Sequence, residues 1–104
     1  MLSAEPRLAN AAWDWGGGDW ESALGAAAHM GRRDIAEYLL ACGARLDVFS
    51  AAMLGRLEIV RAMLDDNPAL RAAPGPHGIS LLAHAQAGGE EAAEVAALIE
   101  SSDA

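Results

Sequence analysis

Apolar residues recur along the chain in a pattern typical of short helices arranged in pairs. An Ala-Ala-x-x-Gly segment occurs at 27–31 and again at 51–55, and a looser copy at 85–89 needs one inserted residue. In the first two copies an apolar residue follows four positions after the glycine, and an apolar pair follows eight and nine positions after it. The small alanines allow close helix packing, the glycine ends the helix, and the later apolar residues form the stripe of a second helix. Strand formers are few and never alternate, so the pattern predicts an all-α protein.

A second repeated pattern divides the chain into units. The sequence M-L-x-x-x-P-x-L occurs at 1–8 and again at 63–70. Because neither helix of a pair can bury its stripe alone, the pairs must stack in one domain spanning 1–104. We interpret 1–12 as the tail of an incomplete first repeat, followed by a repeat at 13–47, a short repeat at 48–73 and a C-terminal repeat at 74–104.

The segment from Ser22 to Asp47 resembles the ankyrin repeat family. It is similar to that family's T-P-L-H-x-A-A-x-x-G-H-x-x-V-V-x-x-L-L-x-x-G-A consensus, with Ser22 in place of Thr, Gly31 at the turn and Gly43-Ala44 at the end. The resemblance implies an ankyrin-like solenoid of stacked antiparallel helix pairs with short or degenerate hairpin loops. The family's Pro and His are replaced here by Ala23 and Gly25, which predicts a less rigid repeat.

Charge and cysteine content narrow the classes of partner. The formal net charge is −8, from 15 acidic and 7 basic residues, so the surface repels nucleic acid and anionic membranes and favours a basic protein partner. Cys42 is the single cysteine, and no signal peptide or stretch of 18 apolar residues is present. We therefore expect a cytoplasmic protein, while the oligomeric state is left open.

The densest group of candidate binding residues lies at 13–20. This segment holds all three tryptophans of the chain beside a glycine triplet and two carboxylates, which gives the candidates Trp13, Asp14, Trp15, Asp19 and Trp20. Tryptophan is a frequent interface anchor, and an indole face beside a carboxylate suits a cation. The alternative is that the indoles cap the core of the incomplete first repeat. The triplet does not predict phosphate binding, since no Lys or Ser/Thr follows it at the required spacing.

The remaining candidates belong to the predicted short helices and one loop. His29, Met53, Leu54 and His84 fall on the helices that face the concave groove in an ankyrin-like stack, and His77 lies in a loop. Met53 and Leu54 either form an apolar groove floor or pack in the core. None of the histidines has a partner at metal-binding or catalytic spacing nearby in the sequence, so we expect solvated or core-edge histidines and no metal site.

The leading hypothesis is a protein–protein interaction module that binds through its concave groove and its Trp-rich loop. The ankyrin resemblance implies a scaffold without catalytic residues, so we predict no enzyme activity and no cofactor. Two alternatives stay open. One is a small-ligand or weakly catalytic pocket under the Trp-rich loop, using Asp14 or Asp19 with His29. The other is a structural segment of a longer repeat protein, which an exposed apolar face would favour.

Overall fold

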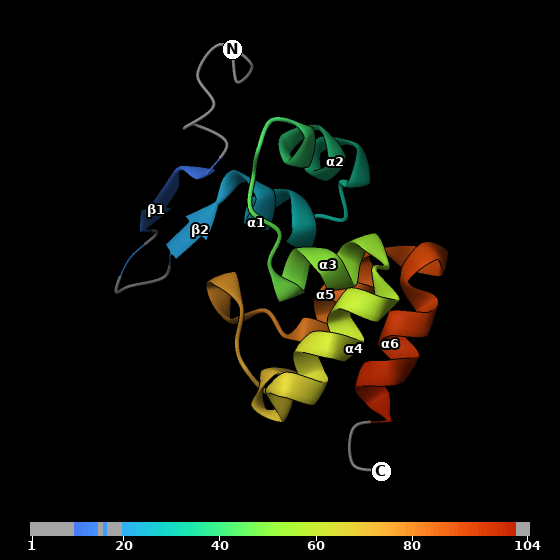
Figure 1. Cartoon of the computed structure of the whole chain (residues 1–104). Coiled ribbons are helices and arrows are strands. Elements are labelled where there is room, and N and C mark those ends of the chain that lie inside the picture. The colour runs from blue at the N-terminus through green and yellow to red at the C-terminus, as the bar shows by residue number, and fades with distance from the viewer. Residues whose placement is uncertain (1–9, 15, 17–19, 102–104) are drawn as a thin grey trace.

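The computed structural model describes residues 10–14, 16 and 20–101, and these fold into a short hairpin and six α-helices (Figure 1). The hairpin pairs β1 (Ala12–Asp14) with β2 (Trp20–Ser22) in antiparallel register. The helices are α1 (Ala23–His29), α2 (Arg33–Ala41), α3 (Val48–Leu54), α4 (Leu57–Asp66), α5 (Leu81–Ala87) and α6 (Ala93–Glu100). Three 3₁₀ turns are η2 (Pro68–Arg71), η3 (Pro76–Gly78) and η4 (Gly89–Ala92). The mainly helical fold is confirmed, whereas the hairpin corrects the expectation of a protein without strands.

The short helices α1, α3 and α5 each begin at a side-chain cap. The hydroxyl of Ser22, the carboxylate of Asp47 and the hydroxyl of Ser80 each accept a hydrogen bond from the backbone N–H three residues later, at 3.0, 2.8 and 3.0 Å. Such caps satisfy N–H groups that have no partner within the helix. These caps fix the residue at which each short helix begins, and with it the residue at which the preceding segment ends.

Each short helix packs against the longer helix that follows it, as the repeat pattern predicted. The contacts join α1 to α2, α3 to α4 and α5 to α6, and α3 also packs against both α1 and α5. The turns between paired helices use glycine in the left-handed region, with φ of 69° at Gly31 and 76° at Gly55, as predicted. Because α1 also contacts α5, the three short helices form a cluster instead of a single row.

This clustering buries two residues that were candidates for a groove floor. Met53 and Leu54 are 0% and 5% exposed and pack in a core cluster with Leu24 and Leu39. Arg33 of α2 fixes their backbone by donating to the carbonyl oxygens of Leu54, at 3.0 Å, and Met53, at 3.3 Å. Met53 and Leu54 are therefore core residues, which corrects the expectation of an exposed apolar floor at this position.

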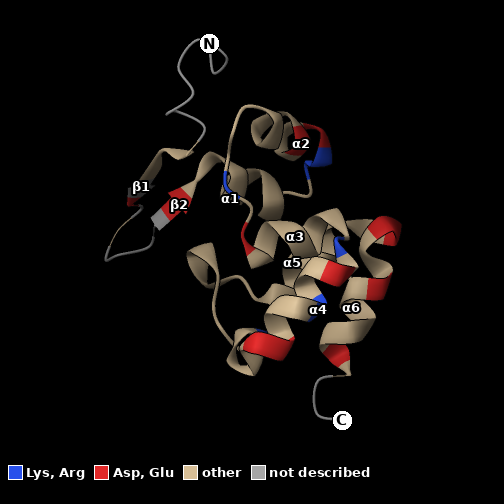
Figure 2. Ribbon diagram, in the orientation of Figure 1, with Lys and Arg blue, Asp and Glu red and all other residues tan. Residues whose placement is uncertain are grey.

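Acidic residues are spread over α2, α4 and α6 (Figure 2). The acidic side chains of these three helices are exposed. Glu21 differs from them, because it is the one acidic residue of the described chain that is buried. None of the helices described here has the length and apolar character that crossing a membrane requires.

Candidate functional site

Glu21 lies at the junction between the hairpin and the first helix. It belongs to β2, where it pairs with Trp13 of β1, and it directly precedes Ser22, the residue that caps α1. Its residue exposure is only 3%. A buried carboxylate is costly unless a charged or hydrogen-bonding group compensates it, so its neighbours determine what this position does.

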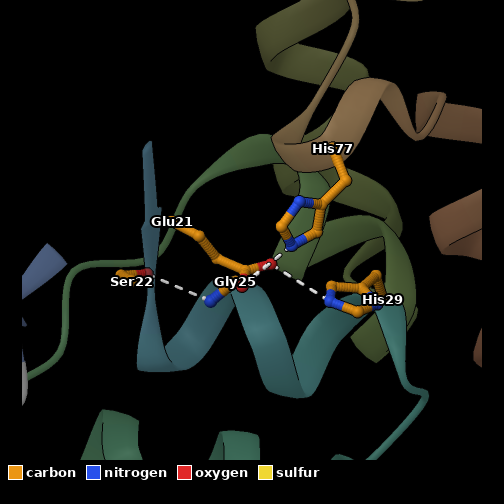
Figure 3. Close-up of polar contacts among 5 residues, drawn as sticks. All are labelled: Glu21, Ser22, Gly25, His29 and His77. Atoms are coloured by element: carbon orange, nitrogen blue, oxygen red, sulfur yellow. Dashed lines mark hydrogen bonds and ion pairs between the residues drawn. The ribbon is translucent and has the colours of Figure 1, made fainter. Parts of the chain in front are cut away.

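Two imidazole rings meet this carboxylate from different parts of the chain (Figure 3). The Nε2 atom of His29, at the end of α1, lies 3.0 Å from Glu21 Oε2. The Nε2 atom of His77, in η3, lies 3.2 Å from Glu21 Oε1. The two rings meet edge-on, with centroids 5.4 Å apart and planes at 86°. We call these three residues the Glu21–His29–His77 cluster.

The backbone of η3 carries His77 to this position. His77 adopts φ 58° and ψ 20°, the left-handed region that residues other than glycine enter infrequently. The turn is closed by hydrogen bonds from Gly78 N to Gly75 O at 2.9 Å and from Ile79 N to Pro76 O at 3.1 Å. Such a conformation costs about 1–2 kcal/mol, and here it accompanies a side chain that reaches across to Glu21.

The cluster leaves one buried oxygen without a hydrogen bond. No hydrogen bond to Glu21 Oε2 is found among the described residues, although His29 Nε2 lies 3.0 Å away. The contact between His29 and Glu21 is therefore an attraction between charged groups when the ring is protonated, without an aligned N–H···O bond. A carboxylate and two imidazoles can exchange protons or bind a cation.

His29 and His77 were both candidates from the sequence, but no sequence pattern placed them together, and Glu21 was not among the candidates. His77 is 56 residues from Glu21, and no local spacing connects the two. A weaker signal was available, because Glu21 precedes the cap of the same helix that ends at His29. The carboxylate that contacts His29 is that of Glu21. The alternative of a small-ligand pocket had placed Asp14 or Asp19 beside His29.

The Trp-rich segment is described only in part. Trp13 and Trp20 lie in β1 and β2, and the exposed Asp14 accepts a hydrogen bond through Oδ1 from Gly16 N at 2.8 Å. Trp15 and Asp19 lie outside the described residues. The segment therefore forms a hairpin before α1, and its predicted role in binding stays a prediction.

His84 is a core residue and does not face a groove. It is fully buried, its Nδ1 atom lies 2.8 Å from the carbonyl oxygen of Ser80, and its ring lies 5.0 Å from that of Phe49. Burial lowers the pKa of His84, because the charged ring would lose its water. We conclude that His84 packs as a neutral ring that donates through Nδ1, which corrects its place among the surface candidates.

An exposed apolar groove lies between α1 and α2. It has a volume of about 360 Å³ and is lined by Ala23, Ala26, Ala27, Met30, Arg32, Ile35 and Leu39. Of the residues that the structure describes, the exposed large hydrophobic side chains are Met30 at 67%, Tyr38 at 52% and Ile35 at 40%, all from this helix pair. Ile35 was predicted to lie in the buried stripe of its helix, and its exposure corrects that prediction. A second groove, between α4 and α6, includes the charged residues Arg61 and Glu94.

Residues 12–41 have the form of one unit of a helical repeat protein: a hairpin, a short capped helix, a glycine turn and a longer helix. Proteins of this class build their binding surfaces from stacked units. Residues 19–50 match the family model of the ankyrin repeat, in agreement with the sequence resemblance. Comparison with the curated proteins gives no match, and neither does comparison with the solved structures. Ankyrin repeats generally mediate protein–protein interaction and are typically not enzymes. The match ends at Ser50, so the repeats at 48–73 and 74–104 stay predictions.

Proposed function

We propose that this chain is a protein-interaction module that binds its partner through the groove between α1 and α2 and through the adjoining Trp-rich hairpin. In this proposal the concave groove expected from the sequence is replaced by the α1–α2 groove, since Met53, Leu54 and His84 are buried. The proposal includes the absence of catalysis and a cytoplasmic location, and it treats the three packed helix pairs as three repeats.

The observation that carries the proposal is the exposure of apolar side chains inside the ankyrin repeat itself. Met30 is 67% exposed beside a groove of about 360 Å³ whose lining is mostly alanine and aliphatic side chains. Contiguous apolar surface of this kind marks interaction sites on folded proteins, whereas single exposed apolar residues do not. Met30 and Ile35 line this groove, and methionine is a flexible side chain that is enriched at interfaces.

The charges around the groove indicate the chemistry of the partner. Arg32 lines the groove and pairs with Asp34 at 3.1 Å, so these two charges offset each other. Glu37 lies exposed on α2, and the whole chain carries a formal charge of −8. Electrostatic complementarity speeds association and suppresses unsuitable partners. The occupant we propose is therefore a protein segment that inserts apolar side chains between α1 and α2 and presents Arg or Lys beside them. Nucleic acid and anionic lipid are excluded from the proposal for the same reason.

The hairpin supplies the second half of the proposed surface. Trp13 and Asp14 lie in β1 and Trp20 lies in β2. Trp15 and Asp19 fall between the two strands in the sequence. This part rests on residue type, since tryptophan beside carboxylates suits a basic side chain. It is tested separately from the groove, so that either half can fail alone.

The experiment is affinity capture from the source cells followed by binding measurements with the purified partner. Three variants are compared with the wild type: Met30→Glu in the groove, a Trp13→Ala/Trp15→Ala double variant, and Ala97→Glu in the α4–α6 groove as the matched control. We expect Ala97→Glu to bind the partner like the wild type. Met30→Glu should bind at least about tenfold more weakly, because it places a charge where the partner would bury an apolar side chain. The double variant should lose part of the affinity. Equal binding by Met30→Glu would overturn the groove assignment.

Self-association is measured in parallel by sedimentation. A dimer that forms through the groove and is lost in Met30→Glu would favour the alternative, in which the chain is a segment of a longer repeat assembly. A monomer under the same conditions supports the interaction module.

A further inference from the structure

We propose that the Glu21–His29–His77 cluster binds a single divalent transition-metal ion of the Zn²⁺ class. This inference is independent of the proposed protein-binding surface, because none of its three residues lines the α1–α2 groove. It also departs from the sequence analysis, which predicted no metal site.

The donor atoms already converge as the ligands of one ion would. One atom from each residue, a carboxylate oxygen of Glu21 and a ring nitrogen of each histidine, lies within 4.8 Å of the other two. The two contacts to the carboxylate are 3.0 Å and 3.2 Å. Metal–nitrogen and metal–oxygen bonds of about 2.0–2.2 Å in a tetrahedral site place ligand atoms about 3.3 Å apart. Small side-chain adjustments therefore suffice to surround an ion.

The ligand set matches the chemistry of such ions. Imidazole suits Zn²⁺ and its neighbours in the first transition row, and two histidines with one carboxylate form a recurrent three-ligand set that keeps a position open. The side chains of His29 and His77 are 19% and 32% exposed, so the cluster borders solvent. Water or a small anionic or nitrogen ligand would complete the coordination.

The buried oxygen of Glu21 provides a second, independent observation. The Glu21 side chain is 2% exposed, and its Oε2 atom accepts no hydrogen bond from the described residues. Buried polar atoms normally take part in a hydrogen bond, whereas Glu21 Oε2 has only the contact with His29 Nε2 at 3.0 Å. An ion between Glu21 and the two rings would satisfy this oxygen.

A bound ion would join parts of the chain that are distant in sequence. Glu21 and His29 belong to the ankyrin repeat, whereas His77 belongs to the turn before α5. An ion that binds the folded state and not the unfolded chain stabilises the fold by mass action. The site therefore predicts metal-dependent stability as well as metal binding.

The test is calorimetric titration of Zn²⁺ into the full chain, prepared without a histidine tag and stripped with a chelator. We expect one equivalent to bind in the micromolar range or tighter. Each of Glu21→Gln, His29→Gln and His77→Gln should lose at least about tenfold in affinity, since even outer-shell partners of a metal contribute about 10- to 100-fold. Glu37→Gln, an exposed carboxylate outside the cluster, and Cys42→Ser should bind like the wild type.

A second readout guards against variants that fail to fold. His77→Gln changes a partly exposed side chain in a turn, so circular dichroism should show an unchanged helical fold. Zn²⁺ should raise the melting temperature of the wild type and not that of His77→Gln, and bound Co²⁺ should give visible absorption bands only in the wild type. Absence of saturable binding would overturn the proposal. Undiminished binding by His77→Gln, or loss of binding only in Cys42→Ser, would overturn it equally.

Discussion

Substitution of Gly55 by alanine tests how the middle helix pair packs on the C-terminal pair. Gly55 ends α3 with φ 76°, and a Cβ atom there would overlap the carbonyl oxygen of Glu91 in η4. Gly43 offers a matched control, because it also has a positive φ, 102°, but a Cβ atom there would meet no atom within 4 Å. The two variants therefore share a backbone cost and differ in the steric cost.

The magnitudes follow from these two costs. A left-handed conformation with a Cβ atom costs about 1–2 kcal/mol, partly offset by the reduced freedom of the unfolded chain, so Gly43→Ala should destabilise by about 1 kcal/mol. Gly55→Ala adds the cost of moving η4 away, about 1–3 kcal/mol for overpacking. The total for Gly55→Ala is then about 2–4 kcal/mol, and each kcal/mol corresponds to about 4–8 °C in melting temperature.

The assay is urea denaturation of both variants, followed by circular dichroism in buffer containing a chelator, with thermal melts as a second measure. The prediction is a larger loss of unfolding free energy for Gly55→Ala than for Gly43→Ala, with unchanged denaturant slopes. Equal losses would refute the close approach of the α3 terminus to η4, and with it the packing of α3 against the C-terminal pair.

Two further predictions concern core residues that were candidates for the surface. Met53→Ala should lower the free energy of unfolding by about 2–5 kcal/mol, because Met53 is fully buried. Met30→Ala should change it by less than about 0.5 kcal/mol, because Met30 is 67% exposed. Similar losses for the two variants in urea denaturation would contradict the assignment of Met53 to the core. A further prediction concerns the pH dependence of stability. Burial lowers the pKa of His84 in the folded state, so below about pH 6.5 the unfolded chain binds a proton more readily than the folded chain does. The free energy of unfolding should therefore be highest above about pH 6.5 and should fall as the pH drops below that value. His84→Gln should flatten that part of the profile of stability against pH, and an unchanged slope in the variant would mean that other groups cause it.

The features that the sequence predicted correctly are those that depend on neighbouring residues. The alanine pairs and the glycines at 31 and 55 specify close packing and a left-handed helix end through local geometry, so the helix pairs followed from their spacing. The hairpin did not, because strands of three residues are too short to show alternation. The positive φ of His77 had no local signal either, although Gly78 follows it.

The candidate site could not be predicted from the sequence, because its residues are brought together only by tertiary packing. The burial of Met53 depends on the packing of α3 against α1, which places it in one core cluster with Leu24. The contact between Glu21 and His77 spans 56 residues and exists only once η3 has packed beside α1. Met30 and Ile35 are exposed because no other described segment covers their side of α1 and α2. This too depends on how the helices pack in three dimensions.

The central claim is that the ankyrin repeat at 19–50 binds a protein partner through the groove between α1 and α2. The most direct measurement is hydrogen–deuterium exchange of the chain with and without the purified partner, read over α1, α2 and α4. The account predicts slower exchange over residues 23–41 on binding, with α4 unchanged. Protection confined to α4 and α6, with 23–41 unaffected, would contradict it.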